Sequence, residues 1–226
     1  MSTRAEPTAL LTDKYELTML AAALRDGTAQ RRTTFELFAR RLPDGRRYGV
    51  VAGTGRLLEA LASFEFDEPA LDSVRGFLDP DTVAYLTQYR FRGDIDGYAE
   101  GELYFPGSPV LTVRGTFAEC VVLETLSLSI LNHDSAIASA AARMVGAADG
   151  RPIIEMGSRR THEQAAVAAA RAAYSRGSPA RPILRPSATT ACRRWAPARM
   201  RSHCCTPPPM VQTSVRRFVP RWMRSG

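Results

Sequence analysis

The 226-residue sequence predicts an α/β fold class, in which an α+β N-terminal domain precedes the start of a strand–helix series. Three observations support this prediction. Residues 93–117 have a β pattern with loops at glycines and prolines, residues 119–147 form the longest helical segment, and residues 151–174 show a strand, a polar turn and a helix in succession. The expected divisions are 1–118, 119–174 and 175–226.

The N-terminal 118 residues alternate between helical and extended patterns. Thr12 and Asp13 are suitable caps for a first helix. Pro43, Asp44 and Gly45 indicate a turn between two strands. The expected helices are residues 15–24, 56–64, 69–77 and 81–89, and the expected strands at this turn are residues 33–42 and 47–55.

Residues 151–174 carry the first candidate site. Pro152, Ile153 and Ile154 predict a short buried strand, and the alanine-rich residues 163–174 predict a helix. Arg159 and Arg160 then follow the carboxyl end of a strand, where α/β folds usually meet their ligands. A guanidinium group binds a carboxylate or phosphate bidentately, so an anionic ligand is one interpretation. A surface ion pair with Glu155 is the other.

The charge of the chain is unevenly distributed. Its formal net charge is +7, yet residues 175–226 hold 11 of the 30 Lys and Arg residues and no Asp or Glu. Residues 1–174 therefore hold 19 basic and 23 acidic side chains, a net charge of −4. The basic, proline-rich segment predicts a disordered tail, and nucleic-acid binding through it is the alternative function of a different class.

Few other classes of site are indicated. Cys192, Cys204, Cys205 and His203 lack the paired CxxC spacing of a zinc site, so we expect no bound metal there. The sequence shows no secretory h-region and no apolar run of membrane-spanning length. We therefore expect a cytoplasmic protein without a membrane partner.

Five ordered blocks resemble one family. They are TDKYELTM from Thr12, FELFARRLP from Phe35, SPVLTVRG from Ser108, ETLSLSILNHDSAIASAAARM from Glu124 and EMGSRRTH from Glu155. Together they resemble nicotinate phosphoribosyltransferase, an enzyme of NAD salvage, and the resemblance covers essentially all of residues 8–174. A related phosphoribosyltransferase acting on nicotinamide or quinolinate is a further alternative, although the TDKYELTM block favours the nicotinate branch.

The resemblance implies a fold, a reaction and site residues. The fold is an N-terminal α+β domain with an incomplete α/β barrel of the type II phosphoribosyltransferase kind. The reaction joins nicotinate to phosphoribosyl pyrophosphate, coupled to hydrolysis of ATP with Mg²⁺ through a phosphohistidine. Tyr15 matches the tyrosine that stacks on nicotinate, often across a homodimer interface, and Arg159 and Arg160 match the basic pair at the substrate site. His133 and His162 lie outside the phosphohistidine motif.

The tail is consistent with the same enzyme read in another frame. The shifted reading frame joins the third base of each codon to the first two bases of the next. With GC-rich codons, this frame encodes an amino-acid sequence that contains the family motif GTSAHA. Trp195 and Met200 each have a single codon, so their third bases are fixed. They therefore determine two residues of the shifted sequence without any choice of codon. Met210, Trp222 and Met223 dictate three more. We therefore predict a one-base slip near Tyr174.

This slip has a functional consequence. The 226-residue chain lacks the GTSAHA histidine, so no catalytic residue is assigned to it. A complete barrel requires about 250 residues, and only its first strand–helix unit is expected here. We therefore expect the chain as written to be inactive.

Overall fold

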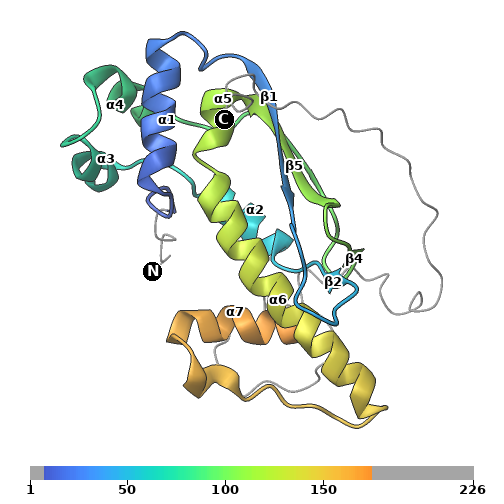
Figure 1. The fold of residues 1–226 in the computed structure, drawn as a ribbon. Coiled ribbons are helices and arrows are strands. Elements are labelled where there is room, and N and C mark those ends of the chain that lie inside the picture. Colours follow the sequence, from blue (N-terminus) through green and yellow to red (C-terminus); the bar gives the residue numbers. More distant parts are fainter. Residues whose placement is uncertain (1–7, 175–226) are drawn as a thin grey trace.

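The computed structural model describes residues 8–174 and has mixed helices and strands, as the sequence predicts. The tail predicted over residues 175–226 lies outside the described residues. Figure 1 shows one long helix running past a sheet, with shorter helices around it. The elements are α1 (Lys14–Arg25), β1 (Arg32–Phe38), β2 (Gly49–Val50), α2 (Thr54–Ala62), α3 (Glu68–Val74), α4 (Pro80–Thr87), β3 (Asp94–Gly97), β4 (Leu103–Tyr104), β5 (Pro109–Thr116), α5 (Phe117–Val121), α6 (Glu124–Ala148), the 3₁₀ helix η1 (Gly157–Arg160) and α7 (Glu163–Tyr174).

The larger sheet is antiparallel and has the order β1-β5-β3. The register of β1 and β5 runs from Arg32 opposite Thr116 to Leu37 opposite Leu111, and it shifts at Phe38. The alternation along β5 buries Leu111 and Val113 in the main core. The predicted strand over 33–42 therefore ends earlier, at the irregularity beside Phe38.

The second predicted strand, residues 47–55, is much shorter in the structure. Only Gly49 and Val50 form β2, which pairs with β4. The Val50 amide donates to Ser139 Oγ at 2.8 Å, and the Ala52 amide donates to Ser135 Oγ at 3.1 Å. Side chains of α6 thus satisfy backbone groups that a neighbouring strand would otherwise bind.

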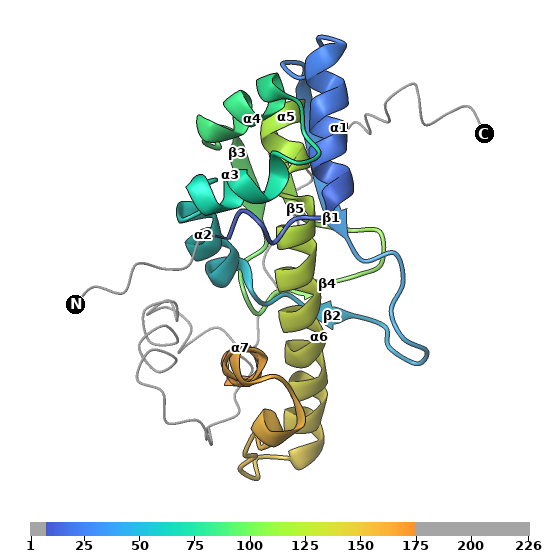
Figure 2. The same ribbon diagram turned by 90° about the vertical axis from the view of Figure 1, so that its left-hand side faces the viewer.

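The main core lies between the sheet and the helices α1 to α6. Leu20, Leu57, Leu86 and Leu126 are among its fully buried side chains. Tyr89 packs edge-on against Phe64, with ring centroids 5.6 Å apart, and its hydroxyl donates to the Glu119 carbonyl. Figure 2 shows α2, α3 and α4 to the left of the long helix and α1 at its upper right. This body positions the N-terminal end of α6.

The predicted single helix over 119–147 is two helices. Thr116 and Glu119 form a capping box at the start of α5, and α6 begins after Val122 and Leu123. The Thr125 amide donates to the carboxylate of Glu16 in α1. Because Glu16 supplies this acceptor, α6 can begin at Glu124 without extending α5.

The predicted buried strand at residues 152–154 is wrong. Ile154 is 57% exposed and forms only an isolated bridge. A strand requires a partner that bonds along its length, and neither sheet of the described residues includes this segment. The polar turn instead becomes η1, whereas the predicted helix is confirmed as α7.

Candidate functional site

A hollow of about 440 Å³ lies beside Tyr15, between α1, β1 and α6. Its apolar lining comes from the end of β1, the start of β5 and one side of α6. Its polar lining comes from α6 and the residues preceding α1. The lining includes Asp13, Tyr15, Phe38, Tyr104, Val110, Thr125, Leu128, Ser129 and Asn132. An aromatic ring beside an apolar wall with few polar groups suits a small planar ligand.

Tyr15 lies in the first turn of α1 and is 44% exposed. Partial burial raises the pKa of its phenol to about 12, and a hydrogen bond to the Glu124 carboxylate contributes to the same shift. The hydroxyl therefore stays protonated at neutral pH. Tyr15 can present its ring to a ligand while its hydroxyl remains bonded to α6.

Arg159 and Arg160 are exposed and belong to η1, and neither of them lines the hollow beside Tyr15. In both views, α1 lies beside the start of α6, whereas η1 lies next to α7 (Figures 1 and 2). Within one copy of the chain, the structure does not bring the predicted tyrosine and arginines together.

The alternative interpretation of the arginines was an ion pair with Glu155. In residues 8–174, Glu155 instead accepts a hydrogen bond from the Gly157 amide, and no ion pair joins it to Arg159 or Arg160. Its Oε2 atom is buried without a hydrogen-bond partner among the described residues. The two guanidinium groups therefore remain accessible.

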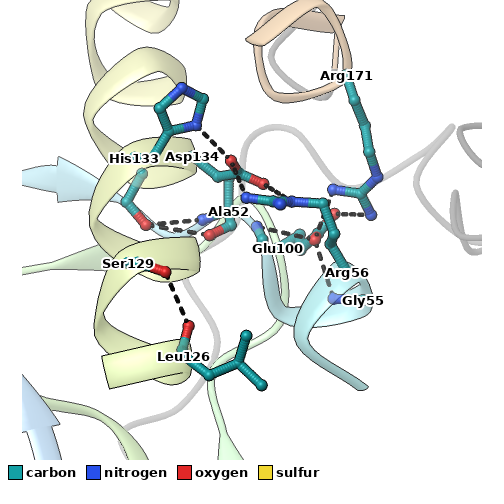
Figure 3. A network of polar contacts seen from close by, with 11 residues as sticks. Ala52, Gly55, Arg56, Glu100, Leu126, Ser129, His133, Asp134 and Arg171 are labelled. Carbon is teal, nitrogen blue, oxygen red and sulfur yellow. Dashed lines mark hydrogen bonds and ion pairs between the residues drawn. The ribbon is translucent and has the colours of Figure 1, made fainter. Parts of the chain in front are cut away.

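A buried carboxylate and a half-buried one form a network that the sequence did not predict (Figure 3). Asp134 in α6 is fully buried, and Arg56 donates to both of its oxygens, at 3.1 and 3.0 Å. The His133 ring also contacts Asp134, with 2.8 Å between Nδ1 and Oδ1. No spacing pattern links residues 78 positions apart, so this pair had no signal in the sequence.

The other carboxylate belongs to Glu100. Arg171 in α7 binds it bidentately, with N–O distances of 2.9 and 3.0 Å. The amides of Gly53 and Gly55 also donate to Glu100 Oε1. Gly53 has a φ of +96°, a conformation that favours glycine and directs these amides toward the carboxylate. Glu100 thus joins α7 to the start of α2.

The two histidines, which lie outside the phosphohistidine motif, make polar contacts with neighbouring residues. His133 lies on α6 beside Asp134, and His162 precedes α7, where its Nδ1 accepts from the Gln164 amide at 3.3 Å. A side chain that accepts a hydrogen bond from an amide in the first turn acts as a helix N-cap. Neither histidine lines the hollow beside Tyr15.

Residues 8–174 contain no cluster of three or more His, Cys, Asp or Glu side chains that could hold a metal ion. Mg²⁺ is commonly held by one or two carboxylates together with substrate phosphates, so this does not bear on Mg²⁺ delivered with a nucleotide. No helix of the same residues is long and apolar enough to cross a membrane.

The sequence matches proteins of one family. The N-terminal domain of nicotinate phosphoribosyltransferase (NAPRTase) matches residues 10–132. Nicotinate phosphoribosyltransferase pncB1 of Mycobacterium tuberculosis is 79% identical over 172 residues, which are 76% of this chain and 38% of that protein. The enzyme of Bacillus subtilis is 36% identical over 171 residues, 74% of this chain and 35% of the relative. The chain therefore spans less than two fifths of these relatives.

Solved structures give the same result. Human nicotinic acid phosphoribosyltransferase superposes with a TM-score of 0.69 at 30% identity, over 74% of this chain and 35% of the human chain. Nicotinate-nucleotide pyrophosphorylase from Pyrococcus furiosus shares the fold, with a TM-score of 0.61 at 23% identity, over 80% of this chain and 40% of that one. The ordered blocks, the matched domain and the fold agree: this chain belongs to the nicotinate phosphoribosyltransferase family.

Proposed function

We propose that the enzyme to which residues 8–174 belong forms nicotinate mononucleotide from nicotinate and phosphoribosyl pyrophosphate. The observation that carries the proposal is the hollow beside Tyr15, within a segment 79% identical to a protein named nicotinate phosphoribosyltransferase. In this proposal, Tyr15 stacks on the pyridine ring. Arg159 and Arg160 neutralise anionic substrate groups, which suits a reaction whose leaving group is pyrophosphate.

We further propose that the complete enzyme is a homodimer with sites shared between subunits. Tyr15 lines the hollow and the arginine pair in η1 does not, so two copies could supply them to one site. Exposed apolar side chains near the hollow, such as Phe38 and Leu128, support a covered surface there. Sedimentation of the complete enzyme as a monomer at micromolar concentration would refute this part.

ATP and Mg²⁺ remain proposals for the complete enzyme. Bound ATP would supply phosphoryl-transfer free energy. Residues 8–174 contain no cluster of acidic side chains to which a metal ion could be assigned. We also propose a cytoplasmic location, because phosphoribosyl pyrophosphate and ATP are intracellular metabolites.

The test compares two proteins. One is the 226-residue chain, and the other carries one base inserted or deleted after the Tyr174 codon so that GTSAHA is read in frame. Each is incubated with labelled nicotinate, phosphoribosyl pyrophosphate, ATP and Mg²⁺, and nicotinate mononucleotide is measured. We expect product only from the reframed protein. Product from the 226-residue chain would refute the predicted inactivity, and no product from either protein would count against the proposed reaction.

Substrate choice is tested in the same assay. The reframed enzyme should use nicotinate in preference to nicotinamide and quinolinate. The nucleic-acid-binding alternative has no support in the comparisons, and its basic segment lies outside the described residues. Equal use of quinolinate would assign the enzyme to another branch of the phosphoribosyltransferases.

A further inference from the structure

The helix α6 begins without a cap of its own. Leu123 occupies the N-cap position and makes no side-chain capping bond. The first amides of a helix have no acceptor within the helix, and the macrodipole of a 25-residue helix favours negative charge at this end. The start of α6 therefore requires an acceptor from elsewhere in the fold.

Glu16 in α1 provides that acceptor from 109 residues away. Its Oε1 accepts a hydrogen bond of 2.8 Å from the Thr125 amide and a second bond from the Thr125 hydroxyl. Its Oε2 accepts from the Thr12 hydroxyl. Both carboxylate oxygens are thus bonded, and α1 is joined to the first turn of α6.

Glu16 is fully buried, which is costly for a carboxylate unless its bonds compensate. Burial raises the pKa of Glu16, and the bonds from Thr12 and Thr125 act in the opposite direction. Glu124 nearby raises the pKa further. A methylene-rich side chain would avoid this cost, so the carboxylate is retained for the bonds that it makes.

Neighbouring residues form a matched pair of contacts between the two helices. Tyr15 bonds to Glu124, and Glu16 bonds to Thr125. Tyr15 and Thr125 also line the same hollow. The position of the Tyr15 ring relative to the α6 wall therefore depends on the Glu16 contact.

We propose that Glu16 is a positioning residue for the nicotinate site: it caps α6 from α1 and thereby fixes the Tyr15 ring against the α6 wall of the hollow. This inference rests on the proposed function for the identity of the ligand. The alignment of Tyr15 can be measured without that ligand. Glu16 itself does not line the hollow.

The first experiment uses the 226-residue chain and its Glu16→Gln variant. We expect the exchange rate of the Thr125 amide to rise about five- to tenfold, as loss of a cap predicts. The Tyr15 ring resonances should shift, whereas those of Tyr48, which packs against Arg143, should not. Glu102→Gln alters an exposed carboxylate and is the matched control. Unchanged Thr125 exchange, or an equal rise at every amide, would overturn the proposal.

A second pair of variants covers the case in which Glu16→Gln does not fold. Thr125→Val removes the hydroxyl donor to Glu16 and keeps the backbone amide, whereas Thr125→Ser keeps both donors. We expect Thr125→Val to shift the Tyr15 ring resonances and Thr125→Ser to resemble the parent chain. Identical Tyr15 spectra for the two variants would overturn the positioning role.

The catalytic readout uses the reframed enzyme. Glu16→Gln should raise KM for nicotinate about fivefold or more and leave KM for phosphoribosyl pyrophosphate unchanged, because a positioning defect concerns the ring site. A fall in kcat with both KM values unchanged would indicate lost folded enzyme and overturn the proposal. An inactive parent enzyme would refute the proposed function alone, since the exchange and ring measurements decide the role of Glu16 without it.

Discussion

The N-terminal body and the segment 149–174 are held in place by different interactions. The body buries a large cluster of leucines, valines and aromatic rings, among them Leu20, Leu126 and Tyr89. The segment contributes Ala172 to a small second cluster. Each buried methyl group contributes only about 0.8 kcal/mol. The body is therefore stabilised by its own core, whereas α7 depends on alanine contacts and on the Glu100–Arg171 ion pair.

The exposed side chains support the same contrast. Ile154 and Met156 in the segment are 57% and 63% exposed. The body also exposes large apolar residues, and Tyr15, Phe38 and Leu128 among them line the hollow of the proposed site. We therefore expect that the segment can detach without unfolding of the body.

The largest expected effect comes from opening a cavity in the body. Leu126→Ala removes a fully buried side chain of α6 from the main core and should cost about 4 kcal/mol of unfolding free energy. Urea denaturation followed by circular dichroism measures this loss. Leu128→Ala on the exposed side of the same helix is the control, and an equal loss in both variants would contradict the assigned core.

Breaking the ion pair tests the attachment of α7. Arg171→Met leaves the Glu100 carboxylate without its bidentate partner and should cost about 3 kcal/mol of local stability. Hydrogen exchange should accelerate in α7 and remain slow in β5. Arg75→Met, which removes an exposed ion pair, is the control. Global unfolding in step with α7 would show that the two regions are one cooperative unit.

Alkaline pH should weaken the body. Burial raises the pKa of Tyr85 to about 12, and burial also raises that of Tyr89. An unfolded tyrosine ionises near pH 10. The folded body therefore retains protons that the unfolded chain loses, and its stability falls as the pH rises above 10. We expect a loss of about 1 to 2 kcal/mol by pH 12 from Tyr85, after allowance for its partial exposure.

The variant Tyr85→Phe sharpens this test. It should reduce the slope of unfolding free energy against pH between 10 and 12, and leave stability near pH 7 almost unchanged. Denaturation series at several pH values would measure the slope. An identical slope in the variant and the parent chain would refute the contribution of Tyr85.

The smallest expected effect concerns the start of α5. Thr116→Ala removes the capping box formed with Glu119 and should cost about 1 kcal/mol. Thermal unfolding measures the corresponding fall in Tm. Thr116→Ser retains the capping hydroxyl and should restore stability. A Ser variant as unstable as the Ala variant would assign the loss to the methyl group instead.

Local patterns predicted most elements of the body. Capping residues and periodicity indicated α1, and the helices expected over residues 69–77 and 81–89 correspond to α3 and α4. The errors occurred where distant groups decide local structure. Ser139 and Ser135 bind amides at β2 that its partner strand β4 does not bind, and Glu16 bonds to the first turn of α6. Bonds between residues about 80 to 110 positions apart leave no periodic signal.

The candidate site was predictable only through resemblance. The TDKYELTM block identified Tyr15, which the structure places at the hollow, and no contact of residues 8–174 tests its role in binding nicotinate. Arg159 and Arg160 were expected at a strand end and lie in η1 instead. The predicted strand is absent because a strand requires a hydrogen-bonded neighbouring strand. The pattern of residues 151–155 does not show whether such a neighbour is present.

The separation of Tyr15 from Arg159 and Arg160 means that, in the proposed dimer, each site draws on two copies of the gene product. A strain producing one copy altered at Tyr15 and another altered at Arg159 would form mixed dimers. In such a dimer, one site would combine both defects and the other would contain neither. Two alleles that are each inactive alone would then complement one another.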